Sequence, residues 1–189
     1  MRRRVFLRYA AGLPLLGVAG CKRRPAPPAP GPKCAPVSAD ATPAPLSPHE
    51  RGTLEAVCAR VLPTDEEPGA TEAGVTAYIE SQLQVPPANS FRHNFSVALK
   101  RIDGLARRQG RPFAELAPEA QDGVLRQFQR LRLSRTATGS HFMRVLVSLV
   151  LEGFLSDPVY GGNRNEAGWK VVRFEPMEPR PRCPYRGRG

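Results

Sequence analysis

The side chains that could carry out chemistry are few in this sequence and widely separated. His49, His93 and His141 lack the short spacing that brings several ligands to one metal ion, so we expect them at the surface or at helix caps. Neither the dinucleotide-binding pattern G-x-G-x-x-G nor the haem-attachment pattern C-x-x-C-H occurs. Glu66-Glu67 fits an ordinary exposed turn, and none of the serines lies in a nucleophile elbow (Ser81, Ser90 and Ser96). We therefore predict no catalytic residue, no metal ion and no cofactor bound by this chain.

The four cysteines have different expected roles. Cys58 falls on an apolar stripe with helical spacing, so we expect a buried thiol. Cys34 and Cys183 lie in expected tails, where they can pair with each other, or one of them can bridge to a partner in an oxidising compartment. We hypothesise that Cys183 forms the bridge. Cys21 belongs to the N-terminal segment.

The N-terminus has the features of a bacterial export signal. A basic start precedes a short apolar stretch, which is about half as long as a helix that spans a bilayer. The run Arg3-Arg4-Val5-Phe6-Leu7 resembles the twin-arginine motif, which directs folded proteins across the membrane. An ordinary secretory signal with an additional arginine is the alternative. We therefore expect residues 1–20 to be a signal peptide and the protein to lie on the periplasmic side of the bacterial envelope.

Cys21 ends a sequence that resembles a lipoprotein-processing site. Small residues precede it in the run Leu16-Gly17-Val18-Ala19-Gly20, and acylation would make Cys21 the new N-terminus. A plain cleavage site with an incidental cysteine is the alternative. Each acyl methylene buried in the bilayer contributes about 0.8 kcal/mol to attachment. Residues 22–48 contain nine prolines and almost no large apolar residue, so we expect residues 21–47 to be an extended tether.

The formal net charge of +11 does not indicate nucleic-acid binding, because of where the charges lie. Residues 1–33 carry +8 and residues 169–189 carry +4, which leaves −1 on residues 34–168. A nucleic-acid-binding domain normally has its basic patch on the folded face that meets phosphate. We therefore expect no nucleic-acid partner and a nearly neutral folded body.

Apolar residues recur at helical spacing through this body. The run Ser47-Pro48-His49-Glu50 is a typical helix start with a capping box, and Pro63-Thr64-Asp65 ends that helix. We expect further helices at about 70–84, from a cap at Asn89 to Gly110, at about 118–133 and at about 139–155. The predicted fold class is therefore all-α, a small bundle of about five helices with an irregular C-terminal loop rich in glycine and aromatic residues.

The third of these expected helices has a basic side, opposite its apolar side. The basic residues are Arg92, Lys100, Arg101, Arg107 and Arg108. This side is the best candidate in the body for an anion-binding surface, and an ordinary solvated helix face is the alternative.

The last expected helix is apolar almost all the way round. Polar residues recur at every fourth position from Ser140 to Ser156, so we expect one narrow polar stripe on a helix that is otherwise buried. Such a helix lies either at the centre of the bundle or at a surface shared with a partner. In the following segment, Tyr160 and Trp169 suit an interface anchor, and a loop packed only on its own chain fits equally well.

Two blocks of the sequence resemble the gluconate 2-dehydrogenase subunit 3 family, over about residues 50–174. The first block, Leu62 to Ile79, contains a turn motif formed by Pro63, Thr64, Asp65, Gly69 and Gly74. The second block runs from Glu152 to Lys170. Within it we assign the partner interface to Glu152, Phe154, Asp157, Pro158, Tyr160, Gly161, Gly162, Asn163 and Trp169.

The resemblance implies a non-catalytic small subunit of a membrane-associated dehydrogenase that acts on gluconate or a sugar. It implies a large partner subunit of the GMC type, which carries FAD and has no export signal, and often a cytochrome c subunit that receives the electrons. The twin-arginine signal would then carry the folded pair across the membrane.

The lipid anchor and the tether depart from the family pattern. They suggest that the helical domain at 48–174 is held at the membrane by this chain itself, with residues 175–189 as an additional basic tail. The alternative function is a free-standing helical envelope lipoprotein with a binding or structural role.

Overall fold

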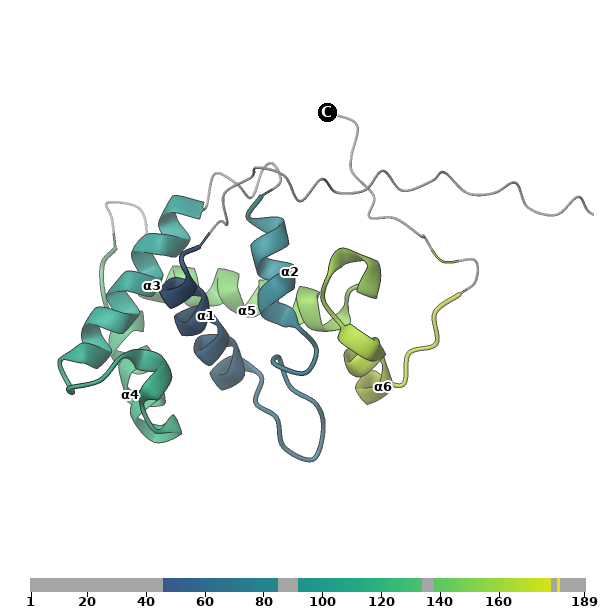
Figure 1. The fold of residues 1–189 in the computed structure, drawn as a ribbon, viewed down its shortest axis with the longest axis horizontal. Helices are drawn as coiled ribbons and strands as arrows, with labels where there is room; N and C mark the ends of the chain where they lie inside the picture. Colours follow the sequence, from purple (N-terminus) through teal and green to yellow (C-terminus); the bar gives the residue numbers. More distant parts are fainter. Residues whose placement is uncertain (1–45, 85–91, 134–137, 178–179, 181–189) are drawn as a thin grey trace, which may run out of the picture. The chain divides into compact units, whose positions relative to one another are not determined.

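The structure is a computed structural model that describes residues 46–84, 92–133, 138–177 and 180. These ranges contain no strand, and the single isolated β-bridge within them joins Arg132 and Thr138. The prediction of an all-α fold is therefore confirmed. The helices are α1 Pro48–Val61, α2 Val75–Gln82, α3 Arg92–Arg107, α4 Pro118–Gln129, α5 Gly139–Leu155 and α6 Ala167–Val172, with 3₁₀ turns η2 Phe113–Glu115, η3 Pro158–Tyr160 and η4 Arg164–Glu166 (Figure 1).

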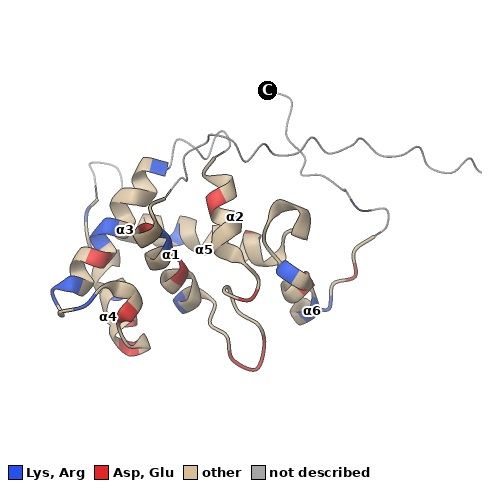
Figure 2. Ribbon diagram, viewed as in Figure 1, with Lys and Arg blue, Asp and Glu red and all other residues tan. Residues whose placement is uncertain are grey.

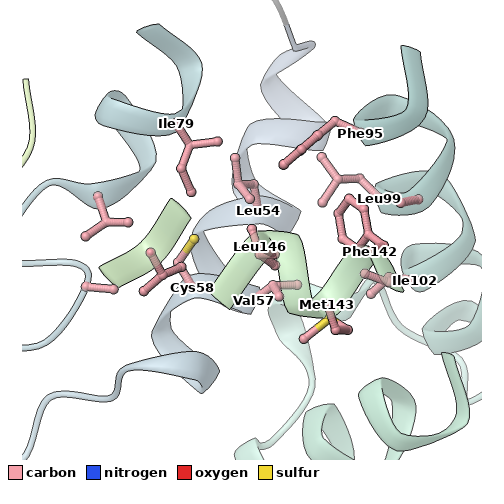
Figure 3. Packing of buried hydrophobic residues seen from close by; sticks show 14 of the residues in the cluster. Leu54, Val57, Cys58, Ile79, Phe95, Leu99, Ile102, Phe142, Met143 and Leu146 are labelled. Atoms are coloured by element: carbon pink, nitrogen blue, oxygen red, sulfur yellow. The ribbon is translucent and has the colours of Figure 1, made fainter. Parts of the chain in front are cut away.

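The core forms where α1, α2, α3 and α4 pack around α5. Helix α5 contacts α1, α2, α4 and α6, and α1 also contacts α3. In Figure 3, Leu54 of α1 and Leu146 of α5 lie at the centre, with Ile79 of α2 on one side and Leu99 of α3 on the other. All four side chains have no exposed surface. Phe142 of α5 extends this core through edge-to-face ring contacts with two other phenylalanines, Phe95 and Phe128.

Two helices have boundaries that differ from the sequence prediction. Helix α2 begins at Val75 because Gly74 adopts left-handed backbone angles (φ 69°), so residues 70–74 form a turn instead. Helix α4 ends at Gln129, and Leu131 accepts a hydrogen bond from the backbone nitrogen of Gly139 at the start of α5. The expected helix cap at Asn89 lies outside the described residues. No helix within the described ranges is long and apolar enough to cross a membrane.

A buried carboxylate joins α1 to α3. Ser47 caps α1, and Glu50 completes the predicted capping box by accepting a hydrogen bond from the backbone nitrogen of Ser47 at 2.8 Å. Glu50 also accepts a hydrogen bond from the hydroxyl of Ser96 and lies 3.6 Å from the ammonium of Lys100. Burial alone would raise the pKa of Glu50, but these hydrogen bonds and Lys100 outweigh burial and lower the pKa to about 2.

Replacing this carboxylate by an amide is expected to change the acid stability of the protein. The pKa of Glu50 in the folded state lies below its ordinary value of 4.5, so its contribution is fully present above pH 4.5 and is lost as pH falls toward 2. Glu50→Gln is expected to lower the free energy of unfolding at pH 7 by about 2 kcal/mol. The variant should also lose less stability than the wild type between pH 4.5 and pH 2.

Urea unfolding across this pH range measures both effects. The exposed substitution Glu66→Gln serves as the control and should change stability little. If the free energy of unfolding changes with pH in the same way for Glu50→Gln and the wild type, the assigned role of Glu50 is contradicted.

Candidate partner-binding site

The two sequence blocks that resemble the family lie against each other. The backbone nitrogen of Arg164 donates to the carbonyl of Ala73 at 2.9 Å, and the Tyr78 hydroxyl donates to Glu152 at 3.4 Å. Gly153 packs directly on the Tyr78 ring, and a Cβ at this position would lie only 2.8 Å from that ring. The first block therefore forms the surface on which the C-terminal half of α5 and the segment after it are packed.

The hydroxyl group of Tyr78 is protonated at neutral pH in the folded protein. Burial, and then the neighbouring carboxylate of Glu152, raise its pKa to about 12. The hydroxyl therefore remains a hydrogen-bond donor to Glu152, which lies on the exposed side of α5. This contact fixes the position of a charged side chain at the edge of the exposed α5 surface.

The turn motif of the first block is a compact hydrogen-bonded structure. Glu72 accepts hydrogen bonds from the Thr64 hydroxyl at 2.5 Å and from the backbone nitrogen of Gly69 at 3.0 Å. Gly69 is required here, because a Cβ would lie 2.6 Å from the carbonyl carbon of Pro63. Asp65 closes the tip by accepting from the backbone nitrogen of Glu67. As predicted, Glu66-Glu67 is an exposed turn.

Asn163 is the central residue of the second block. It has no exposed surface and adopts left-handed backbone angles (φ 45°), which asparagine tolerates better than most residues. Its side chain donates to the carbonyl of Ser156 and accepts from the backbone nitrogen of Gly168, both at 2.8 Å. Its backbone nitrogen donates to the carbonyl of Gly153 at 2.8 Å. One side chain thus joins the end of α5 to the start of α6.

Trp169 lies on the short helix α6 and is only 6% exposed, so it packs on its own chain, which is one of the two arrangements that the sequence left open. Its indole nitrogen donates to the carbonyl of Leu155 at 2.7 Å. This carbonyl is in the last turn of α5, where carbonyl groups have no donor within the helix. Its ring packs edge-to-face on Phe174, and the Arg180 guanidinium lies 5.6 Å from the ring centroid.

Burial divides the residues that we assigned to a partner interface. Phe154, Gly162, Asn163 and Trp169 are buried, and these four hold the segment to its own chain. Of the other five, Glu152 and Gly161 are exposed, and Asp157, Pro158 and Tyr160 are half-buried. The contact of all nine residues with a partner stays a prediction.

The exposed side of α5 carries an apolar stripe. Val147, Leu151 and Leu155 are 38%, 47% and 41% exposed, so α5 is not buried on all of its apolar sides. Four-residue spacing places the three on one face, which α1, α2, α4 and α6 leave uncovered. The polar residues beside this stripe are Arg144, Ser148 and Glu152, all exposed. We name Val147, Leu151 and Leu155 the α5 stripe.

A family model described as gluconate 2-dehydrogenase subunit 3 matches residues 48–176. The chain belongs to the gluconate 2-dehydrogenase subunit 3 family. The match begins at the first residue of α1 and extends past α6, so it includes both blocks and the α5 stripe. No match was found among curated proteins or among solved structures. Membership is consistent with an accessory subunit of a dehydrogenase complex.

The histidines of this family member lie at the surface, as predicted. His49, His93 and His141 are all exposed. The imidazole of His49 lies 2.9 Å from Asp103, a buried carboxylate that also accepts from Arg107 at 2.6 Å and from the backbone nitrogen of Phe113 at 3.0 Å. Within the described ranges no group of three or more His, Cys, Asp or Glu residues is placed to hold a metal ion.

The predicted buried thiol is confirmed, since Cys58 is 1% exposed. Burial raises its pKa to about 12, so the thiol is not a nucleophile at neutral pH. Several residues with predicted roles in export, lipidation or disulfide bonding lie outside the described residues (Arg3, Arg4, Phe6, Leu7, Cys21, Cys34 and Cys183).

Proposed function

We propose that this chain is a non-catalytic subunit that binds a large FAD-dependent gluconate or sugar dehydrogenase through the α5 stripe. The observation that carries the proposal is the stripe itself, on a member of a family named for a dehydrogenase subunit. Large aliphatic side chains aligned on one face of a regular helix are a common basis of helix-mediated recognition. FAD is proposed to lie in the partner, with a cytochrome c subunit as a further partner.

The surroundings of the α5 stripe resemble the edge of a protein interface. Stable interfaces have an apolar centre that is surrounded by polar residues. Here Arg144 and Ser148 flank one part of the stripe and Glu152 flanks another, and the Tyr78 hydroxyl donates to Glu152. Covering the exposed part of three aliphatic side chains contributes roughly 1 kcal/mol each to binding. This contribution is available without rearrangement, because α5 is already ordered by its buried side.

We propose further that this subunit takes its partner across the membrane. The motif at Arg3 and Arg4 and the acylation site at Cys21 support this route, because folded export is needed for a flavoprotein that binds FAD in the cytoplasm. The lipid anchor would then hold the complex at the periplasmic side of the membrane.

Replacing the two arginines by lysine tests the escort role. In cells that contain both subunits, Arg3→Lys with Arg4→Lys is expected to leave the dehydrogenase in the cytoplasm, because the partner has no signal of its own. The matched control is Arg23→Lys with Arg24→Lys, an adjacent arginine pair beyond the expected processing site. Flavin absorbance and dehydrogenase activity in periplasmic and cytoplasmic fractions give the distribution.

Normal export of the dehydrogenase with the first pair of substitutions would contradict the escort role. If the purified wild-type protein is a stable monomer without a flavoprotein, the alternative of a free-standing envelope lipoprotein is favoured instead.

A further inference from the structure

A basic cavity lies between α3 and the end of α4, and its lining includes no residue of the α5 stripe. Its volume is about 270 Å³. Three cations line it from α3 and the residue after it, Lys100, Arg101 and Arg108. Leu105 and Leu131 contribute apolar wall, and Gln127 of α4 contributes an amide. Figure 2 shows basic residues in blue along α3.

A glycine creates the space at the centre of this cavity. Gly104 is one helical turn from each of the three cations, at spacings of three or four residues, so all three side chains belong to one helix face. A Cβ at Gly104 would have no atom within 4 Å. The missing side chain therefore leaves open space between three positive charges.

Two of the three charges around the cavity have no ion-pair partner within the described residues. Among the described residues no carboxylate lines it, and Lys100 has a single long contact with Glu50, at 3.6 Å. Within the described part of the chain, no ion pair forms at Arg101 or Arg108. By contrast, Arg107 on the same helix donates to Asp103 at 2.6 Å. Because the three positive charges line one cavity, they would attract an anion to it.

We propose that this cavity binds a phosphate group. Two planar guanidinium groups and one ammonium provide enough donors for several phosphate oxygens. A carboxylate has only two oxygens and would leave more of these donors without an acceptor. The apolar wall formed by Leu105 and Leu131 also accommodates carbon next to the phosphate. The group can belong to an anionic phospholipid headgroup or to free phosphate, and the site is independent of the proposed partner surface.

The test uses the full-length chain with Cys21→Ala, so that acylation does not tether it to vesicles. One arm measures calorimetric titration with inorganic phosphate, and the other measures flotation with phosphatidylglycerol–phosphatidylcholine vesicles against phosphatidylcholine alone. Arg101→Gln with Arg108→Gln is expected to weaken binding at least about tenfold. The control, Arg111→Gln with Arg126→Gln, removes the same charge from exposed positions outside the cavity and should weaken it less than about twofold.

Gly104→Leu provides a second variant that keeps every charge. A Cβ at Gly104 meets no atom within 4 Å, and the rest of the leucine side chain is expected to occupy the cavity, so binding should again weaken at least about tenfold. Binding of phosphate alone assigns the site to free phosphate, and binding of phosphatidylglycerol vesicles alone assigns it to a headgroup. The absence of both kinds of binding, or equal losses in the cavity and control arginine pairs, would overturn the proposal.

Discussion

Gly162→Ala is expected to destabilise the protein by about 3 kcal/mol, because the new methyl group has no space. A Cβ at Gly162 would lie 2.2 Å from the backbone oxygen of Gly153. The backbone of α5 cannot move away easily, since Gly153 itself packs tightly on the ring of Tyr78. The clash should therefore separate the segment after α5 from the rest of the fold, and urea unfolding should show a lower midpoint.

Gly123→Ala provides a matched control for this prediction. Gly123 lies inside α4, and a Cβ there would have no atom within 4 Å. The same added methyl group should therefore stabilise the protein by about 0.5–1 kcal/mol, because alanine has the higher helix propensity. Equal unfolding midpoints for the two variants would show that close packing at Gly162 does not hold the segment in place.

Local signals in the sequence were sufficient to predict most of the helical framework. The capping box at Ser47 and Glu50 is present as expected, and α5 has the predicted bounds 139–155. Such features depend on residues three or four positions apart, which a sequence displays directly. The backbone conformation of single glycines was harder to predict. The neighbouring residues do not distinguish Gly74, whose left-handed conformation sets the start of α2, from Gly123, which lies inside α4.

Burial in the candidate site could not be predicted in the same way, because it depends on which elements pack together. Residue type alone left open whether Trp169 and Leu151 face a partner or pack on their own chain, and the structure shows that Trp169 is buried and Leu151 is exposed. The exposure of Leu151 follows from the placement of four other helices on the far side of α5. Likewise, the basic side of α3 was predictable, whereas the cavity at Gly104 requires Leu131 to lie beside it.

Leu151→Glu is expected to weaken binding of the dehydrogenase subunit at least about 100-fold, which corresponds to about 3 kcal/mol. Leu151 lies between Val147 and Leu155 at the centre of the α5 stripe and is the most exposed of the three. In a complex that covers the stripe, the carboxylate would be removed from water without a partner. Because glutamate is a good helix former and the position is exposed in the free subunit, its stability should change little.

The affinity of the two purified subunits measures this effect, and two further variants identify its cause. Gln129→Glu places the same charge at an exposed position at the end of α4 and should change Kd less than about twofold. Leu151→Met keeps an apolar side chain of similar volume and should retain most of the binding. An unchanged Kd for Leu151→Glu would exclude the α5 stripe as the interface. It would leave the escort role to be judged separately by the arginine substitutions, because export of the pair requires association but does not require this particular surface.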